Sequence, residues 1–141
     1  MRLPDTNVLL YAVNRHSPQN AVARDWLDRS AREPQGMAMV WVTLVGFIRL
    51  ATRAAIVPEP LGVDRALAQV QQWLDHPSVQ LLQPGVRHMD ILARLLLEAG
   101  TAGNLTTDAH IAAIAIEHNA EVLSFDKDFA RFTGLSYQIL S

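Results

Sequence analysis

Short, mostly apolar runs alternate with longer amphipathic runs along the chain. The short runs predict strands over Arg2–Pro4, Met37–Val42, Val79–Gln83, Glu121–Phe125 and Tyr137–Leu140. The second of these contains no polar residue, which is typical of a strand that is covered on both faces. Between the strands, apolar residues recur every three or four positions, which is the spacing of helices.

The helical runs end at clear stop signals. We expect helices over Val8–Val13, from Pro18 to before Pro34, from Thr43 to Ala51, and over Val63–Asp75, Arg87–Ala99 and Ala109–Ile116. Ser17 and Thr43 are the expected N-caps of the second and third helices. Thr106 or Thr107 is the expected N-cap of the last helix. Prolines 58 and 60 break the chain before the fourth helix.

Two expectations concern the core. On the fourth helix, Val63, Leu67, Val70 and Leu74 recur at helical spacing and are expected to form its buried face. Trp41, in an apolar run, is also expected to lie in the core. The last helix is apolar nearly all round, which predicts that it is buried on every side.

The alternation of strands and helices predicts an α/β fold. The expected architecture is a three-layer α/β/α sandwich with a mostly parallel central sheet and helices on both faces. A chain of 141 residues is expected to form one domain over residues 1–141. In such a sheet the carboxyl ends of the parallel strands lie along one edge, where ligands bind.

Composition narrows the function classes. Half of the residues are hydrophobic and only 18% are charged, which excludes a disordered chain. The net charge is −2, so a nucleic-acid partner would need a local basic patch. The absence of cysteine excludes a disulfide framework and thiolate metal sites. No secretory signal is recognisable and no apolar run reaches the roughly 20 residues of a membrane span, so we expect a cytoplasmic protein without membrane contact.

Three aspartates stand where this fold would bring them together. Asp5 follows the first predicted strand, and Asp126 follows the strand over Glu121–Phe125. Asp108 lies in the first turn of the apolar helix. Each motif alone could be a turn, a helix-dipole contact or a solvated loop. Together, at one edge of a parallel sheet, they predict a shared site.

A cluster of carboxylates favours a bound cation. The charges repel and raise one another's pKa values, and a divalent ion removes that repulsion. All-oxygen ligands without cysteine favour Mg²⁺ or Mn²⁺ over Zn²⁺, and such a site suits phosphodiester hydrolysis. Asp128, two residues beyond Asp126, is a possible further ligand. Arg49 and Arg53 lie either on a solvated helix face or near the site as phosphate contacts.

The motifs resemble those of a known family. Asp5-Thr6-Asn7-Val8-Leu9 resembles the opening motif of PIN-domain ribonucleases. The run from Asp108 to Ala115 resembles their central helix motif, and the run from Ser124 to Phe129 resembles their closing strand motif. Length and order resemble the VapC toxins of bacterial toxin–antitoxin pairs over essentially the whole chain.

The resemblance implies a PIN-like fold and an endoribonuclease that uses Mg²⁺ or Mn²⁺. Asp5, Asp108 and Asp126 would be the catalytic metal ligands, with Asp128 as a possible fourth. The expected substrate is a cellular RNA such as tRNA or ribosomal RNA, and its cleavage would arrest translation.

The resemblance also implies partners. We expect a homodimer whose site is blocked by a cognate VapB-type antitoxin. Thr6, Asn7 and Arg49 are expected to contact the RNA. An RNA-binding groove of the dimer would use Arg15, Arg49 and Arg53.

One departure leaves an alternative open. Gly46 stands where the family usually has a glutamate, so a second metal ion is in question. The alternative is a PIN-fold module that binds RNA or a partner without cleaving. A receiver-like or dehalogenase-like phosphotransfer fold is disfavoured, since the first strand ends in Asp5-Thr6-Asn7 without an Asp-x-Asp pair.

Overall fold

The computed structural model describes residues 1–141, and its centre is a parallel sheet. The strands are β1 (Arg2–Pro4), β2 (Met37–Met39), β3 (Val79–Leu81), β4 (Glu121–Ser124) and β5 (Ser136–Ile139). Their order is β3-β2-β1-β4-β5, and every neighbouring pair is parallel. The carboxyl ends of β1 and β4 therefore lie side by side at the middle of one sheet edge.

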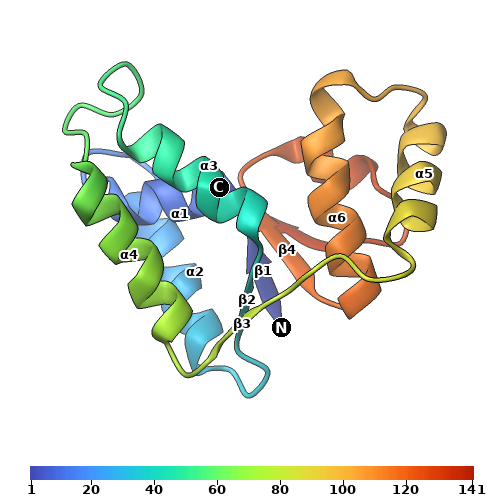
Figure 1. Cartoon of the computed structure of the whole chain (residues 1–141), viewed down its shortest axis with the longest axis horizontal. Coiled ribbons are helices and arrows are strands. Elements are labelled where there is room, and N and C mark those ends of the chain that lie inside the picture. The colour runs from blue at the N-terminus through green and yellow to red at the C-terminus, as the bar shows by residue number, and fades with distance from the viewer.

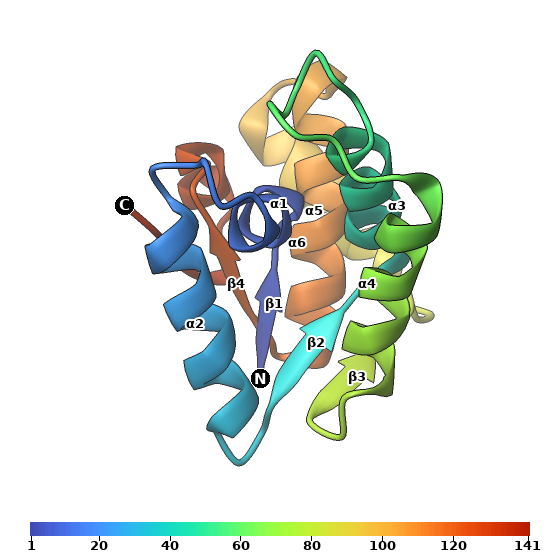
Figure 2. The ribbon, with the colours of Figure 1, turned by 90° about the vertical axis from the view of Figure 1, so that its left-hand side faces the viewer.

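Helices cover both faces of the sheet. They are α1 (Thr6–Val13), α2 (Asn20–Arg32), α3 (Trp41–Ala51), α4 (Val63–Asp75), α5 (His88–Ala99) and α6 (Thr106–His118), with short 3-10 helices η1 (Gly103–Leu105) and η2 (Lys127–Arg131). Figure 1 shows α1 to α4 on one side of the strands and α5 and α6 on the other. The quarter-turn view agrees, with α2 and α4 in front of the sheet and α6 behind it (Figure 2). The expected three-layer sandwich is confirmed.

Each interface between layers has its own hydrophobic core. Eighteen buried residues, Leu3 and Val122 among them, pack between the sheet and α5–α6. Fourteen others, including Met39 and Leu123, pack between the sheet and α1–α4. Because neighbouring residues of a strand point to opposite faces, Val122 and Leu123 belong to different cores. No helix is both long enough and apolar enough to cross a membrane.

Three of the expected helix N-caps were wrong, and α1 begins at Thr6, two residues before the expected Val8. The helix expected from Thr43 begins two residues earlier, at Trp41, and the buried Thr43 hydroxyl donates instead to the Val40 carbonyl at 3.0 Å. Ser17 does not cap a helix, since its hydroxyl accepts from Gln19 N at 3.1 Å in the turn before α2. Helix α6 includes Thr106 and Thr107 and begins without a side-chain cap. Hydroxyl residues compete for local turn geometry, and their position alone does not select which turn forms.

Two expectations about the core were also wrong. Trp41 is 47% exposed, and on α4 Val63 and Leu67 are 65% and 52% exposed. The buried residues of α4 are Ala66 and Val70. Helix α4 therefore packs through the face that carries Ala66 and Val70, and Val63 and Leu67 remain on the surface.

The turn before β2 gives a testable prediction. Gly36 has φ +68°, and a Cβ there would lie 2.3 Å from the Ser78 carbonyl oxygen, which accepts from Met37 N. We expect Gly36→Ala to lower the free energy of unfolding by about 3 kcal/mol, measured by urea denaturation, because it adds a backbone overlap to left-handed strain. Gly103→Ala is the control, since its φ is also positive but nothing lies within 4 Å. Equal losses of unfolding free energy in the two variants would contradict an overlap between the added Cβ and the Ser78 carbonyl oxygen.

Candidate active site

Asp5 stands at the point where β1 passes into α1. Its side chain is buried and caps the helix, with Oδ1 accepting from Thr6 N at 2.7 Å. Its Oδ2 accepts from the Ser124 hydroxyl at 2.7 Å. The Asp5 backbone N–H donates to the Leu123 carbonyl at 2.8 Å and ties the carboxyl ends of β1 and β4 together. Both carboxylate oxygens are thus held in fixed positions.

Asp126 and Asp128 stand where β4 passes into η2. Asp126 Oδ1 accepts from the Asp128 backbone N–H at 2.9 Å, which caps η2. The Asp126 backbone N–H donates to the Ser124 hydroxyl oxygen at 2.9 Å. The Asp126 carboxylate also shares a side-chain hydrogen bond with Asp108.

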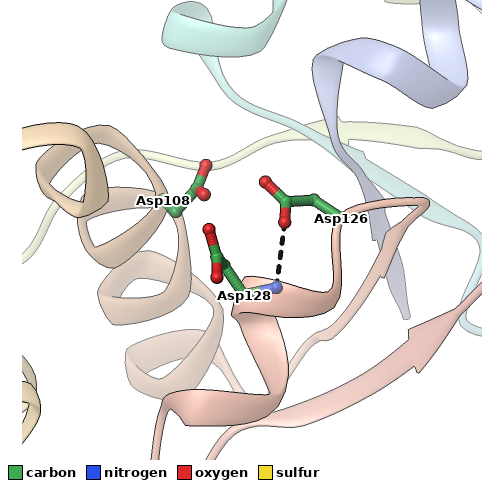
Figure 3. A group of neighbouring side chains, drawn as sticks. All are labelled: Asp108, Asp126 and Asp128. Atoms are coloured by element: carbon green, nitrogen blue, oxygen red, sulfur yellow. Dashed lines mark hydrogen bonds between the residues drawn. The ribbon is translucent and has the colours of Figure 1, made fainter.

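Helix α6 brings Asp108 to the same place. Asp108 lies in its first turn and points toward Asp126 and Asp128 (Figure 3). Carboxylate oxygens of these three residues lie within 4.8 Å of one another. The predicted meeting of Asp108 with Asp126 is therefore present, and Asp128 belongs to the group. Asp5 stands beside it, at the end of the cleft that Asp108 also lines.

Sequence reasoning missed Ser124, which links the site. Its buried hydroxyl donates to Asp5 and accepts from Asp126 N and from Asn7 Nδ2, the last at 3.3 Å. Asn7 Oδ1 in turn accepts from Phe125 N at 3.4 Å. Asn7 is thus braced against β4. The signals for Ser124 in the sequence were its place at the start of the closing strand motif and its polar side chain between the apolar Leu123 and Phe125.

The carboxylates disfavour one another's charge. Burial, and then the charges of Asp5 and Asp126, raise the pKa of Asp108 from 3.8 to about 7. Burial also raises the pKa of Asp5, against the hydrogen bonds from Ser124 and Thr6. No lysine, arginine or histidine forms an ion pair with any of the four aspartates. The group therefore carries unbalanced negative charge.

A cleft of about 580 Å³ opens from these carboxylates between α1, α3 and α6. Asp5 and Asp108 line one end of it, together with Thr6 and Asn7. Arg49 lines the α3 wall, whereas Arg53 does not line the cleft. Arg49 is thus the single basic residue facing this space.

The structure shows what occupies the place of the missing glutamate. A Cβ on Gly46 would lie 3.0 Å from Thr6 Oγ1 and 3.1 Å from Thr6 Cγ2. The Thr6 hydroxyl donates to the Thr43 carbonyl at 3.4 Å, so Thr6 packs across the helix at this point. The α3 wall therefore supplies no carboxylate, and Thr6 would have to shift by a few tenths of an ångström to admit a side chain at position 46.

A family model and curated relatives show which family the chain belongs to. The PIN-domain family matches residues 2–135. The chain belongs to the PIN-domain family. Within this family, its curated relatives include the ribonuclease VapC37 of Mycobacterium tuberculosis, 46% identical over 97% of this chain and 95% of the relative. Ribonuclease VapC31 of the same species is 38% identical over 97% of this chain and 96% of the relative.

Solved structures share the PIN fold. VapBC2 of Rickettsia felis, bound to a DNA fragment from its promoter, has a TM-score of 0.73 at 18% identity and covers 99% of this chain and 98% of its own. VapC20 of M. tuberculosis, a Sarcin-Ricin loop cleaving toxin, has a TM-score of 0.69 at 16% identity, covering 96% of this chain and 99% of its own. At these identities the likeness concerns the fold.

The raised pKa of Asp108 predicts a pH dependence of stability in the absence of divalent metal. The folded protein keeps the Asp108 proton up to about pH 7, whereas an unshifted aspartate releases it near 3.8. We therefore expect the free energy of unfolding in EDTA to fall as the pH rises from about 4 to about 7. In Asp108→Asn this part of the fall should disappear.

Urea denaturation at a series of pH values measures the effect. Asp90→Asn, which changes an exposed aspartate in the first turn of α5, is the matched control. If Asp108→Asn ran parallel to the parent from pH 4 to pH 7, the raised pKa would be wrong.

Proposed function

We propose that this chain is a VapC-type toxin, a metal-dependent endoribonuclease that cleaves cellular RNA such as tRNA or ribosomal RNA and thereby inhibits translation. The observation that carries the proposal is the group of Asp108, Asp126 and Asp128 oxygens within 4.8 Å of one another, beside the buried Asp5. The relatives that cover nearly the whole chain are named as VapC ribonucleases, which supports the same activity.

The donor set fits a hard divalent cation. Asp5, Asp108 and Asp126 are the proposed ligands, with Asp128 as a fourth, and all of them offer oxygen atoms. Mg²⁺ or Mn²⁺ suits such ligands and would neutralise the repulsion that raises the pKa of Asp108. When bound, the ion supplies a Lewis acid and a coordinated water of lowered pKa, as phosphodiester hydrolysis requires.

The chain's own residues hold the reacting groups in place. The hydrogen bonds from Thr6 N and Ser124 fix the Asp5 carboxylate, and its remaining lone pairs stay available. We propose that Arg49 contacts a phosphate of the RNA from the α3 wall, because a planar guanidinium binds phosphate with two hydrogen bonds. Thr6 and Asn7 line the same cleft and would contact the RNA backbone beside that phosphate.

The proposal includes partners. Structural neighbours are toxin–antitoxin complexes, such as VapBC-1 of nontypeable Haemophilus influenzae, which supports a VapB-type antitoxin for this chain. We also propose a homodimer. Trp41 and Val45, one turn apart on α3, are 47% and 58% exposed, and burying them between two copies would remove apolar surface from water. RNA and antitoxin would both be met in the cytoplasm.

A second candidate is a PIN-fold module that binds RNA or a partner without cleaving it. The absence of a carboxylate at Gly46 favours it, because a metal site with fewer acidic ligands binds Mg²⁺ more weakly. Calorimetric titration with Mn²⁺ separates the two candidates. A chain that takes up no Mn²⁺ near millimolar concentration would support the binding module.

Replacing one proposed ligand tests the nuclease. We expect Asp108→Asn to lower the rate of RNA cleavage in Mg²⁺ at least about 100-fold, because it removes a charged ligand while keeping the shape of the side chain. Mn²⁺ uptake should weaken in the same variant. Cleavage of labelled tRNA and ribosomal RNA by purified protein, together with calorimetry, measures both quantities.

The control is Asp90→Asn, which removes an equal charge from an exposed position outside the cleft. It should cleave RNA and bind Mn²⁺ as the parent does. If Asp108→Asn cleaved RNA at the parent's rate in Mg²⁺, the assignment of Asp108 as a catalytic metal ligand would be wrong.

A further inference from the structure

A second hollow, of about 790 Å³, lies beyond the other end of α1. Its walls come from the end of α1, the start of α2, and α4 with the loop that precedes it. Three arginines line it, namely Arg15, Arg24 and Arg65. They come from three different segments of the chain, so the fold alone brings these guanidinium groups to one place.

The three guanidinium groups have no partner within the protein. None of them forms an ion pair or a side-chain hydrogen bond. The single carboxylate that lines the hollow, Glu59, is 80% exposed and pairs with His16 Nε2 at 3.3 Å. With His16 neutral, the three arginines and Glu59 give the lining a net charge of +2 (3 − 1), and a concave surface with excess positive charge concentrates anions.

The chemistry of arginine indicates which kind of anion the hollow would bind. A guanidinium offers a planar set of donors that matches the oxygens of a phosphate, and arginine is prominent at sites that recognise phosphate. Asn14 adds a polar side chain to the same wall. The hollow therefore suits a phosphate group.

The hollow lies within reach of the carboxylate cleft. Asp5 stands at the start of α1 and Arg15 just beyond its end, and a helix of this length spans about 12 Å. Leu10 lines both the cleft and a small hollow, and that hollow shares Val13 and Glu59 with the arginine hollow. The cleft and the arginine hollow are thus both lined by residues of α1, and the small hollow shares lining residues with each of them. The phosphates of a stacked strand are about 3.4 Å apart, so the length of this helix corresponds to about four phosphates.

A local basic site would offset the acidic character of this protein toward an RNA strand. The net charge is −2, and the cleft itself carries clustered aspartates with Arg49 as its one basic side chain. We propose that Arg15, Arg24 and Arg65 form a phosphate-binding site for the stretch of RNA that flanks the scissile position. The inference rests on the proposed ribonuclease function and names where its substrate is held.

The test removes two of the three charges. Binding of fluorescein-labelled 12-nucleotide oligo(U) is followed by anisotropy in EDTA at several NaCl concentrations, so that no cleavage occurs. We expect Arg24→Gln/Arg65→Gln to bind at least 10-fold more weakly and to reduce the slope of log K against log salt by about 1.4, as the loss of two single-strand phosphate contacts requires.

The matched control is Arg32→Gln/Arg131→Gln. These two arginines are exposed, lack ion pairs, and line neither the cleft nor the arginine hollow, so the variant loses the same charge elsewhere. Urea denaturation checks that both variants fold, and Arg15→Gln alone repeats the test if the first double variant does not fold. Equal losses of RNA affinity in the two double variants would overturn the proposal.

Two further outcomes are decisive. If the hollow variant lost affinity for a labelled 12-residue polyglutamate peptide while keeping its RNA affinity, the hollow would bind an acidic peptide and the RNA site would be overturned. Hydrolysis of bis(p-nitrophenyl) phosphate in Mn²⁺, measured on the parent, reports the metal chemistry separately. If the parent does not hydrolyse this compound but Arg24→Gln/Arg65→Gln still loses RNA affinity selectively, the phosphate-binding site is supported and the nuclease function is contradicted.

Discussion

The main constraint on this structure is the electrostatic repulsion between carboxylates at the edge of a buried parallel sheet. The other contacts of the fold have to hold these groups together against it. Asp5 and Asp126 follow neighbouring strands, and α6 carries Asp108 to the same edge. Burial and like charge raise the pKa of Asp108 to about 7, which is a cost that the folded chain bears without metal. Functional sites are where such destabilising arrangements are kept.

The rest of the fold resists that repulsion. Helix α6 is buried almost all round, so Asp108 is fixed by a helix that cannot rotate without breaking the core. Ser124 and the first N–H of α1 hold Asp5 by hydrogen bonds to its ionised form, which partly oppose the desolvation of its charge. The same contacts tie β1 to β4 at the point where both strands end. Stability and site geometry are therefore provided by the same contacts.

Acidic and basic side chains occupy separate parts of the surface. Acidic groups gather where a cation would reside, while Arg49 and the arginine hollow lie along the cleft wall and beyond α1. An acidic protein can bind a polyanion through such local patches, since screening limits the repulsion of distant charges to within about 10 Å at ordinary salt. The hollow's three arginines would then hold the strand, and the carboxylates would be left to act on one phosphate.

The sequence by itself determined the alternation of strands and helices, and with it the parallel sheet and the edge at which Asp5, Asp108 and Asp126 stand. These features follow from local periodicity and from the rule that parallel strands end on one side. Only the tertiary structure decided that Ser124 joins Asp5 to Asp126, that Asp128 completes the group, and that α4 leaves Val63 and Leu67 exposed. It also gathered three arginines from separate segments. Such outcomes depend on how elements rotate and pack against one another, which periodicity along one segment does not encode.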